Sequence, residues 1–141
     1  MIVLDTNVVS ETIKPKPNPH VMSWLERQEL SDVHVSGPGL MEQSYGAERY
    51  LRKTGSRRYL DFLAQVMDVD FHGRILEFLD PAPVVAGRIR AERERIGRPI
   101  NVQDAMIAAI CLVHGAALAT RNVRDFEDLG LTLVNPFEPV G

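Results

Sequence analysis

The stretch INVQDAMIAAICLVHGAALATRN, residues 100–122, decides the fold. Apolar residues at positions 102, 105, 106, 109, 110 and 113 trace one face of a helix, and the opposite face is apolar as well. The sequence therefore predicts a helix that is buried nearly all round, from Asn101 to His114, with Gly115 as its C-terminal stop. AALAT at 116–120 follows directly and predicts a buried strand that ends on the polar Thr120.

The rest of the chain repeats this alternation of short apolar strands and longer helices. Further strands are expected at 2–4, 32–36, 74–78 and 131–134, and helices are expected to start near Pro19, Gly37, Arg57 and Asp80. The connections are too long for hairpins, which is typical of a parallel sheet with helices on both faces. The predicted fold class is α/β, with a central parallel sheet of four to five strands in one domain over residues 1–141.

The composition is that of an ordinary globular protein. Of the 141 residues, 45% are hydrophobic and 25% are charged, and the net charge is -3. An acidic chain is not expected to coat nucleic acid, although this charge is compatible with a metal-dependent nuclease. The single cysteine, Cys111, lies in the longest apolar run, which is too short to cross a bilayer. We therefore expect a cytoplasmic protein without a disulfide, a secretory signal or a membrane segment.

Acidic side chains recur where predicted strands end or helices begin. Asp5 follows the first strand, and Asp104 lies in the first turn of the buried helix. Glu42 lies in the second turn of the helix after the second strand, and Asn122 and Asp125 follow the strand that ends on a threonine. Because the carboxyl ends of parallel strands meet at one edge of a sheet, we expect these side chains to lie close together.

Each of these residues also has an ordinary structural interpretation. Asp5 is a good cap for a helix that starts directly after it. Asp104 can complete a capping box with Asn101, although such a box usually has Glu or Gln at this position. A helix glutamate such as Glu42 is usually solvated, and Asn and Asp after a strand usually form a turn. Together, the acids favour a site for a hard divalent ion, Mg²⁺ or Mn²⁺, because carboxylates this close repel one another without a cation.

Four segments in this order resemble the PIN-domain ribonucleases, specifically the VapC toxins of bacterial toxin–antitoxin pairs in their FitB-like branch. The segments are MIVLDTNVVSE at 1–11, VSGPGLMEQSYG at 35–46, GRILEF at 73–78 and INVQDAMIAAICLVHGAALATRN at 100–122. The resemblance runs from end to end of the chain. It implies that Asp5, Glu42 and Asp104 are catalytic and hold the metal, directly or through water.

The resemblance further implies a Mg²⁺-dependent endoribonuclease that hydrolyses RNA phosphodiester bonds with a metal-activated water. The chain departs from the family pattern at the fourth acid, where Asn122 stands and family members often have Asp; Asp125 is the other candidate ligand there. Three polar residues are expected to orient the carboxylates, namely Thr6, Asn7 and Thr120. Gly46, one turn after Glu42, is expected to permit a close approach of another segment.

Basic residues that are candidates for binding RNA lie after Glu42, in its helix and just beyond, and beside the fourth acidic position. They are Arg49, Arg52, Lys53, Arg57, Arg58, Arg121 and Arg124. A further basic cluster comprises Arg88, Arg90, Arg93 and Arg95. Glutamates at 92 and 94 stand four residues after two of these arginines, which is the spacing of ion pairs on a solvated helix face. The first set is therefore the better candidate for RNA.

The resemblance also implies partners: an RNA substrate, a cognate antitoxin protein, a second copy of the chain in a homodimer, and operator DNA only through the antitoxin. We expect the antitoxin to place a cationic side chain among the acids. A receiver-like or phosphatase-like domain would normally need a Lys or Thr at a later strand end. Thr120 is available there, but no lysine follows Lys53, so this is the weaker enzyme interpretation. The other alternative is a catalytically weak or inactive PIN-like module that binds RNA or protein, which Asn122 alone supports.

Overall fold

The structure is a computed structural model that describes residues 1–139, so residues 140 and 141 of the predicted domain lie outside the described residues. Its centre is a five-stranded sheet in the order β3-β2-β1-β4-β5, and all neighbouring strands are parallel. The strands are β1 (Ile2–Leu4), β2 (Val33–Ser36), β3 (Ile75–Leu76), β4 (Ala117–Ala119) and β5 (Leu133–Val134). The predicted α/β class and parallel sheet are confirmed.

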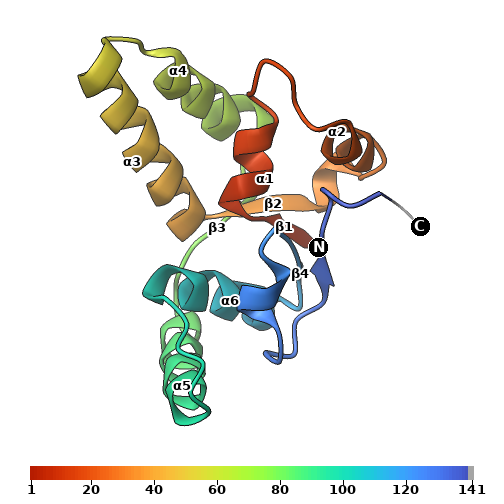
Figure 1. Ribbon diagram of the computed structural model, residues 1–141, viewed down its shortest axis with the longest axis vertical. Helices are drawn as coiled ribbons and strands as arrows, with labels where there is room; N and C mark the ends of the chain where they lie inside the picture. Colours follow the sequence, from red (N-terminus) through yellow and green to blue (C-terminus); the bar gives the residue numbers. More distant parts are fainter. Residues whose placement is uncertain (140–141) are drawn as a thin grey trace.

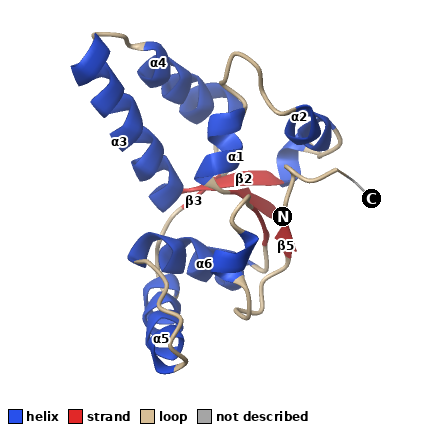
Figure 2. Ribbon diagram, viewed as in Figure 1, coloured by secondary structure: helices blue, strands red, loops and turns tan. Residues whose placement is uncertain are grey.

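Helices cover both faces of this sheet (Figures 1 and 2). The α-helices are α1 (Thr6–Glu11), α2 (Pro19–Glu26), α3 (Gly37–Thr54), α4 (Arg58–Gln65), α5 (Ala82–Arg95) and α6 (Val102–His114). Shorter helical segments are η1 (Leu30–Asp32), the π-helical turn η2 (Val66–Asp70) and η3 (Val123–Phe126). The first four α-helices lie on one side of the sheet, and α5 and α6 lie on the other (Figure 1). Among residues 1–139, no helix is long and apolar enough to cross a membrane.

The central strand β1 contributes to two cores because its side chains alternate between the faces of the sheet. Val3 packs with α6 and α5, whereas Ile2 and Leu4 pack with the core under α1 and α2. Helix α6 lies between the sheet and α5, so Ile107 and Ile110 are almost completely buried. This position explains why nearly every side of α6 is apolar.

The edge strands are shorter than predicted. The expected strand at 74–78 pairs with β2 only through Ile75 and Leu76, and the expected strand at 131–134 is reduced to Leu133–Val134. An edge strand has a hydrogen-bonding neighbour on one side only, so fewer backbone bonds hold it in extended form. The helix expected to start near Arg57 begins at Arg58 and changes to π-helical geometry after Gln65.

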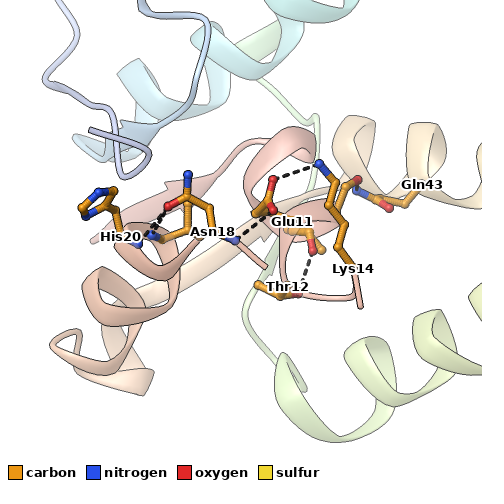
Figure 3. Close-up of polar contacts among 9 residues, drawn as sticks. Glu11, Thr12, Lys14, Asn18, His20 and Gln43 are labelled. Carbon is orange, nitrogen blue, oxygen red and sulfur yellow. Dashed lines mark hydrogen bonds and ion pairs between the residues drawn. The ribbon is translucent and has the colours of Figure 1, made fainter. Parts of the chain in front are cut away.

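A buried glutamate anchors α1, the helix that follows directly after Asp5 (Figure 3). Glu11 is 5% exposed; Lys14 Nζ lies 3.0 Å from its Oε1, and the backbone N–H of Asn18 donates to its Oε2 at 3.0 Å. The hydrogen bond from Lys14 holds the pKa of Glu11 below its usual value. On the other side of α1, Gln43 of α3 donates to the backbone oxygen of Thr6 at 2.9 Å. These contacts fix α1 between α2 and α3.

Candidate active site

The candidate site lies at the carboxyl ends of the three central strands. Asp5 follows β1 directly, and Thr120 follows its neighbour β4. On the other side, β2 ends at Ser36, whose side chain caps α3, the helix that carries Glu42. Asp104 comes from the first turn of α6. The predicted gathering of strand ends at one edge therefore brings these segments together.

Both carboxylate oxygens of the buried Asp5 accept hydrogen bonds. Oδ1 accepts from the backbone N–H of Thr6 at 2.8 Å, so Asp5 is also the N-cap of α1. Oδ2 accepts from the Thr120 hydroxyl at 2.8 Å and from Asn7 Nδ2 at 3.4 Å. Asn7 Oδ1 in turn accepts from the backbone N–H of Arg121 at 3.2 Å. The two interpretations of Asp5, as a helix cap and as a site residue, do not exclude each other, because Asp5 caps α1 at the edge where the strands end.

Glu42 is exposed, and two segments hold its Oε2. The Thr6 hydroxyl donates to it at 2.8 Å, and Gln103 Nε2 donates to it at 2.7 Å. Gln103 also reaches the backbone oxygen of Pro38 at 3.4 Å, so it connects the start of α6 to the start of α3. Gln103 was missed in the sequence analysis, although a polar residue beside Asp104 in an otherwise apolar helix was an available signal.

Asp104 forms only part of the expected capping box. Its backbone N–H donates to Asn101 Oδ1 at 2.7 Å, which is the usual N-cap bond. Its carboxylate, however, accepts from the side-chain Nδ2 of Asn101 at 3.0 Å and not from the backbone N–H of that residue. The second carboxylate oxygen of Asp104 has no hydrogen-bond partner within residues 1–139 and stays free for a ligand.

The charges of the acidic side chains act on one another. Burial raises the pKa of Asp104 to about 6, and the negative charges of Asp5, Asp125 and Glu42 add to this rise. Burial also raises the pKa of Asp5, with smaller contributions from the charges of Glu42 and Asp125, against the opposing hydrogen bonds from Thr120 and Thr6. Four carboxylates from four segments therefore share one electrostatic environment.

Asp125 joins this group through its charge, whereas the Asn122 side chain is neutral. Asp125 and Asp104 line the same polar cavity of about 440 Å³. The backbone N–H of Asn122 donates to the Thr120 hydroxyl at 3.0 Å, but its side chain makes no hydrogen bond within residues 1–139. Of the two candidates for the fourth acidic position, Asp125 is the one that carries charge into the site.

The donor set suits a hard divalent ion held partly through water. Every candidate donor is a carboxylate or amide oxygen, and Mg²⁺ and Mn²⁺ prefer oxygen ligands. Among residues 1–139, no three acidic, histidine or cysteine side chains are close enough to hold one ion together. Mg²⁺ usually keeps several waters and takes one or two carboxylates directly, so a looser ring of acids is compatible with it.

The predicted RNA-binding residues fall in separate places. Arg49, Arg52 and Lys53 line an open groove along α3 with Tyr50 and Gly46. Tyr50 and Gly46 also line a neighbouring, mostly apolar cavity of about 350 Å³ that reaches Thr6 and Glu42. Nothing lies within 4 Å of where a Cβ on Gly46 would be, so the predicted close approach at this glycine is wrong; Gly46 widens the groove instead.

The remaining basic candidates make local contacts. Arg58 donates to the backbone oxygen of Ile13 at 3.0 Å, and Arg57 lies 3.9 Å from Asp61. The guanidinium of Arg121 stacks 4.4 Å from the centre of the Phe137 ring. The last candidate, Arg124, lines the same polar cavity as Asp104 and Asp125.

Comparisons with known proteins agree with this arrangement. A family model for the PIN domain matches residues 2–130. Toxin FitB of Neisseria gonorrhoeae is 34% identical over 137 residues, which cover 97% of this chain and 99% of FitB. The tRNA(fMet)-specific endonuclease VapC of Shigella flexneri is 35% identical over 130 residues, 91% of each chain. In the structure of FitAB bound to an IR36 DNA fragment, a chain of 30% identity superposes with a TM-score of 0.89 and covers 100% of this chain and 99% of its own. The chain therefore belongs to the PIN domain family, in the branch of the FitB and VapC toxins.

Proposed function

We propose that the chain is a Mg²⁺-dependent endoribonuclease, formed by one PIN domain over residues 1–141, and that it is the toxin of a toxin–antitoxin pair. The observation that carries the proposal is the group of four mutually repelling carboxylates at the strand ends, with the pKa of Asp104 raised to about 6. Relatives named as VapC ribonucleases and as toxin FitB support the activity and the role. The substrate is RNA, and the reaction is hydrolysis of a phosphodiester bond.

The carboxylates of Asp5, Glu42, Asp104 and Asp125 are the proposed metal ligands, directly or through water, and Asn122 is not needed for charge. Mg²⁺, or Mn²⁺ in its place, would lower the pKa of a bound water and offset the charge of the phosphate. Hydrogen bonds from the Thr6, Asn7 and Thr120 side chains keep the carboxylates oriented when the ion is absent.

The path of the RNA is proposed to follow the basic groove along α3. Arg49, Arg52 and Lys53 are exposed there, and the adjoining cavity leads to Glu42. Arg124 lines the polar cavity of Asp104 and Asp125, where it can contact the phosphate next to the cleaved bond. Contacts to phosphates position a strand without reading its sequence, so these residues do not name the RNA.

Structures of similar proteins suggest the partners. FitAB and VapBC are complexes of toxin and antitoxin, and several were solved with DNA. We infer a cognate antitoxin for this chain, with a cationic side chain placed among the acids and operator DNA reached through the antitoxin. A homodimer and a cytoplasmic location stay predictions. The apolar residues Trp24 and Leu25 of α2 are one candidate dimer face, and they are partly buried against the core of their own chain.

Cleavage of total RNA by the purified chain, free of antitoxin, tests the proposed function. Asp104→Asn is the most informative variant, because the introduced amide oxygen keeps the bond from Asn101 while the charge is removed. Asp68→Asn makes the same chemical change at an exposed surface position and serves as the control. Each protein is assayed with Mg²⁺, with Mn²⁺ and with chelator.

Discrete fragments produced by the wild type and Asp68→Asn with Mg²⁺ or Mn²⁺, and lost with chelator or Asp104→Asn, are the expected result. The fragments would also identify the RNA. If the folded wild type and Asp104→Asn give the same pattern, the acids are not catalytic. The chain would then be a PIN-like module that binds RNA or protein without cleaving RNA.

A further inference from the structure

Arg93 of α5 is buried, in contrast to its expected place on a solvated helix face. It is 3% exposed, and it follows Ala82, Ala86 and Ile89 on the buried side of the helix. Within residues 1–139 no acidic side chain forms an ion pair with it. A buried guanidinium without a carboxylate is costly, so its retention calls for a physical reason.

The guanidinium of Arg93 is bound to the segment that carries Asp125. Nη2 donates to the backbone oxygens of Asp125 and Glu127, both at 2.9 Å, and Nη1 donates to the backbone oxygen of Arg98 at 3.3 Å. The planar fork of arginine makes this double contact possible, and a lysine would reach fewer acceptors. Nε is buried without a hydrogen-bond partner within residues 1–139. The Arg93 guanidinium therefore holds the backbone at Asp125, in η3, and at Glu127, the residue after η3.

Arg93 also lines the polar cavity that contains the carboxylates of Asp104 and Asp125. Its neighbour Arg98 also lines this cavity and donates to the backbone oxygen of Arg124 at 3.3 Å, but Arg98 is exposed and pairs with Asp128 at 3.0 Å. Arg93 is therefore the buried cation that holds the segment of Asp125 beside this cavity.

We propose that Arg93 is a positioning residue of the metal site, which holds Asp125 beside Asp104 through its hydrogen bonds to the backbone oxygens of Asp125 and of Glu127, the residue after η3. The proposal rests on the proposed function, because it assumes that these acids bind a divalent ion. A purely structural arginine would affect folding stability alone. A positioning arginine affects metal affinity in protein that is still fully folded.

The test uses Arg93→Met, which removes the fork and the charge, and Arg93→Lys, which removes the fork and keeps the charge. Arg90→Met removes the same charge from the exposed side of the same helix and is the matched control. Thermal unfolding in chelator first establishes that each variant is folded at the assay temperature. The Mn²⁺ dissociation constant is then measured by electron paramagnetic resonance, and amide hydrogen exchange is followed across residues 122–128.

The expected result is a loss of Mn²⁺ affinity of about 10- to 100-fold for Arg93→Met, as for other residues that orient metal ligands. Arg93→Lys should also bind more weakly, with faster exchange confined to residues 122–128, and Arg90→Met should match the wild type. Wild-type affinity in folded Arg93→Met would overturn the proposal. If Arg93→Met does not fold, a wild-type affinity for Mn²⁺ in Arg93→Lys would overturn the proposal. A wild type that binds no Mn²⁺ would instead overturn the metal site and the inference with it.

Discussion

Replacing Asp104 by Asn is expected to stabilise the metal-free protein and to abolish metal-dependent cleavage. The carboxylate oxygen that accepts from Asn101 can be replaced by the amide oxygen, and the backbone N–H of residue 104 keeps its bond to the same side chain. The variant therefore retains the cap of α6. It loses only the charge that Asp5, Asp125 and Glu42 oppose.

The size of the gain follows from the raised pKa. A change from 3.8 to about 6 corresponds to about 3 kcal/mol if each pKa unit is worth about 1.4 kcal/mol. Because Asp104 is only half-buried, solvent screening reduces this free energy to about half. The variant also loses the attraction between the Asp104 charge and the positive end of α6, which lowers the gain in stability by about 0.5 kcal/mol more. The net gain is about 1 kcal/mol, or a rise in Tm of about 3 °C for a domain of this size.

The gain must depend on pH. A raised pKa means that the native state binds the Asp104 proton more tightly than the unfolded chain does. The stability contributed by this proton is fully present below the unfolded value of 3.8 and is lost as the pH rises through about 6. The Tm difference between Asp104→Asn and the wild type should therefore be close to zero near the unfolded pKa and reach its full value well above the folded one.

Calorimetry in chelator across this pH range measures the effect, with Asp68→Asn as the exposed control. Added Mg²⁺ should raise the Tm of the wild type by mass action and leave that of Asp104→Asn unchanged. A variant that is less stable than the wild type at neutral pH would refute the reasoning. So would a gain that is equally large in acid, because it could not arise from the ionisation of Asp104.

Three further substitutions test other parts of the site. Gly46→Ala should raise the free energy of unfolding by about 0.5–1 kcal/mol in urea titrations, since an exposed helical glycine gains rigidity and meets no neighbour; a loss of stability would show that the backbone there is not an ordinary helix. Thr120→Val should lower the free energy of unfolding by about 1–3 kcal/mol, because it removes the donor to Asp5 and the acceptor for a backbone N–H; an unchanged urea midpoint would contradict the buried hydrogen-bond network. Asp125→Asn should reduce Mg²⁺-dependent cleavage far more than Asn122→Ala does, and the reverse order in a cleavage time course would return Asn122 to the fourth position.

The overall fold and the four acid-bearing segments could be predicted because both depend on local patterns. A short apolar run followed by a polar residue identifies the end of a parallel strand, and parallel strands end at the same edge. Asp5 and Thr120 follow neighbouring strands and are therefore joined by a hydrogen bond across 115 positions. This inference needed no knowledge of any particular contact.

Contacts between helices were harder to predict. Gln103 reaches Glu42 across 61 positions, and nothing in the local sequence of either residue specifies the pairing. Arg93 is a different case, because its spacing from Ala86 and Ile89 already places it on the buried face of α5. The expected pairing of arginines with glutamates four residues later obscured that signal. The ion pair that forms on this helix joins Arg95 to Glu92, three residues apart.

The two central aspartates differ in what they reveal about function. At Asp5 both oxygens accept hydrogen bonds, so an amide would turn one donor toward another, and the carboxylate has a structural reason to be there. At Asp104 one oxygen has no partner within residues 1–139, and an amide would satisfy the same bonds without repulsion. Folding stability alone therefore favours Asn at position 104. The charge of Asp104 is the feature that stability does not explain, and it is the feature that the proposed metal site requires.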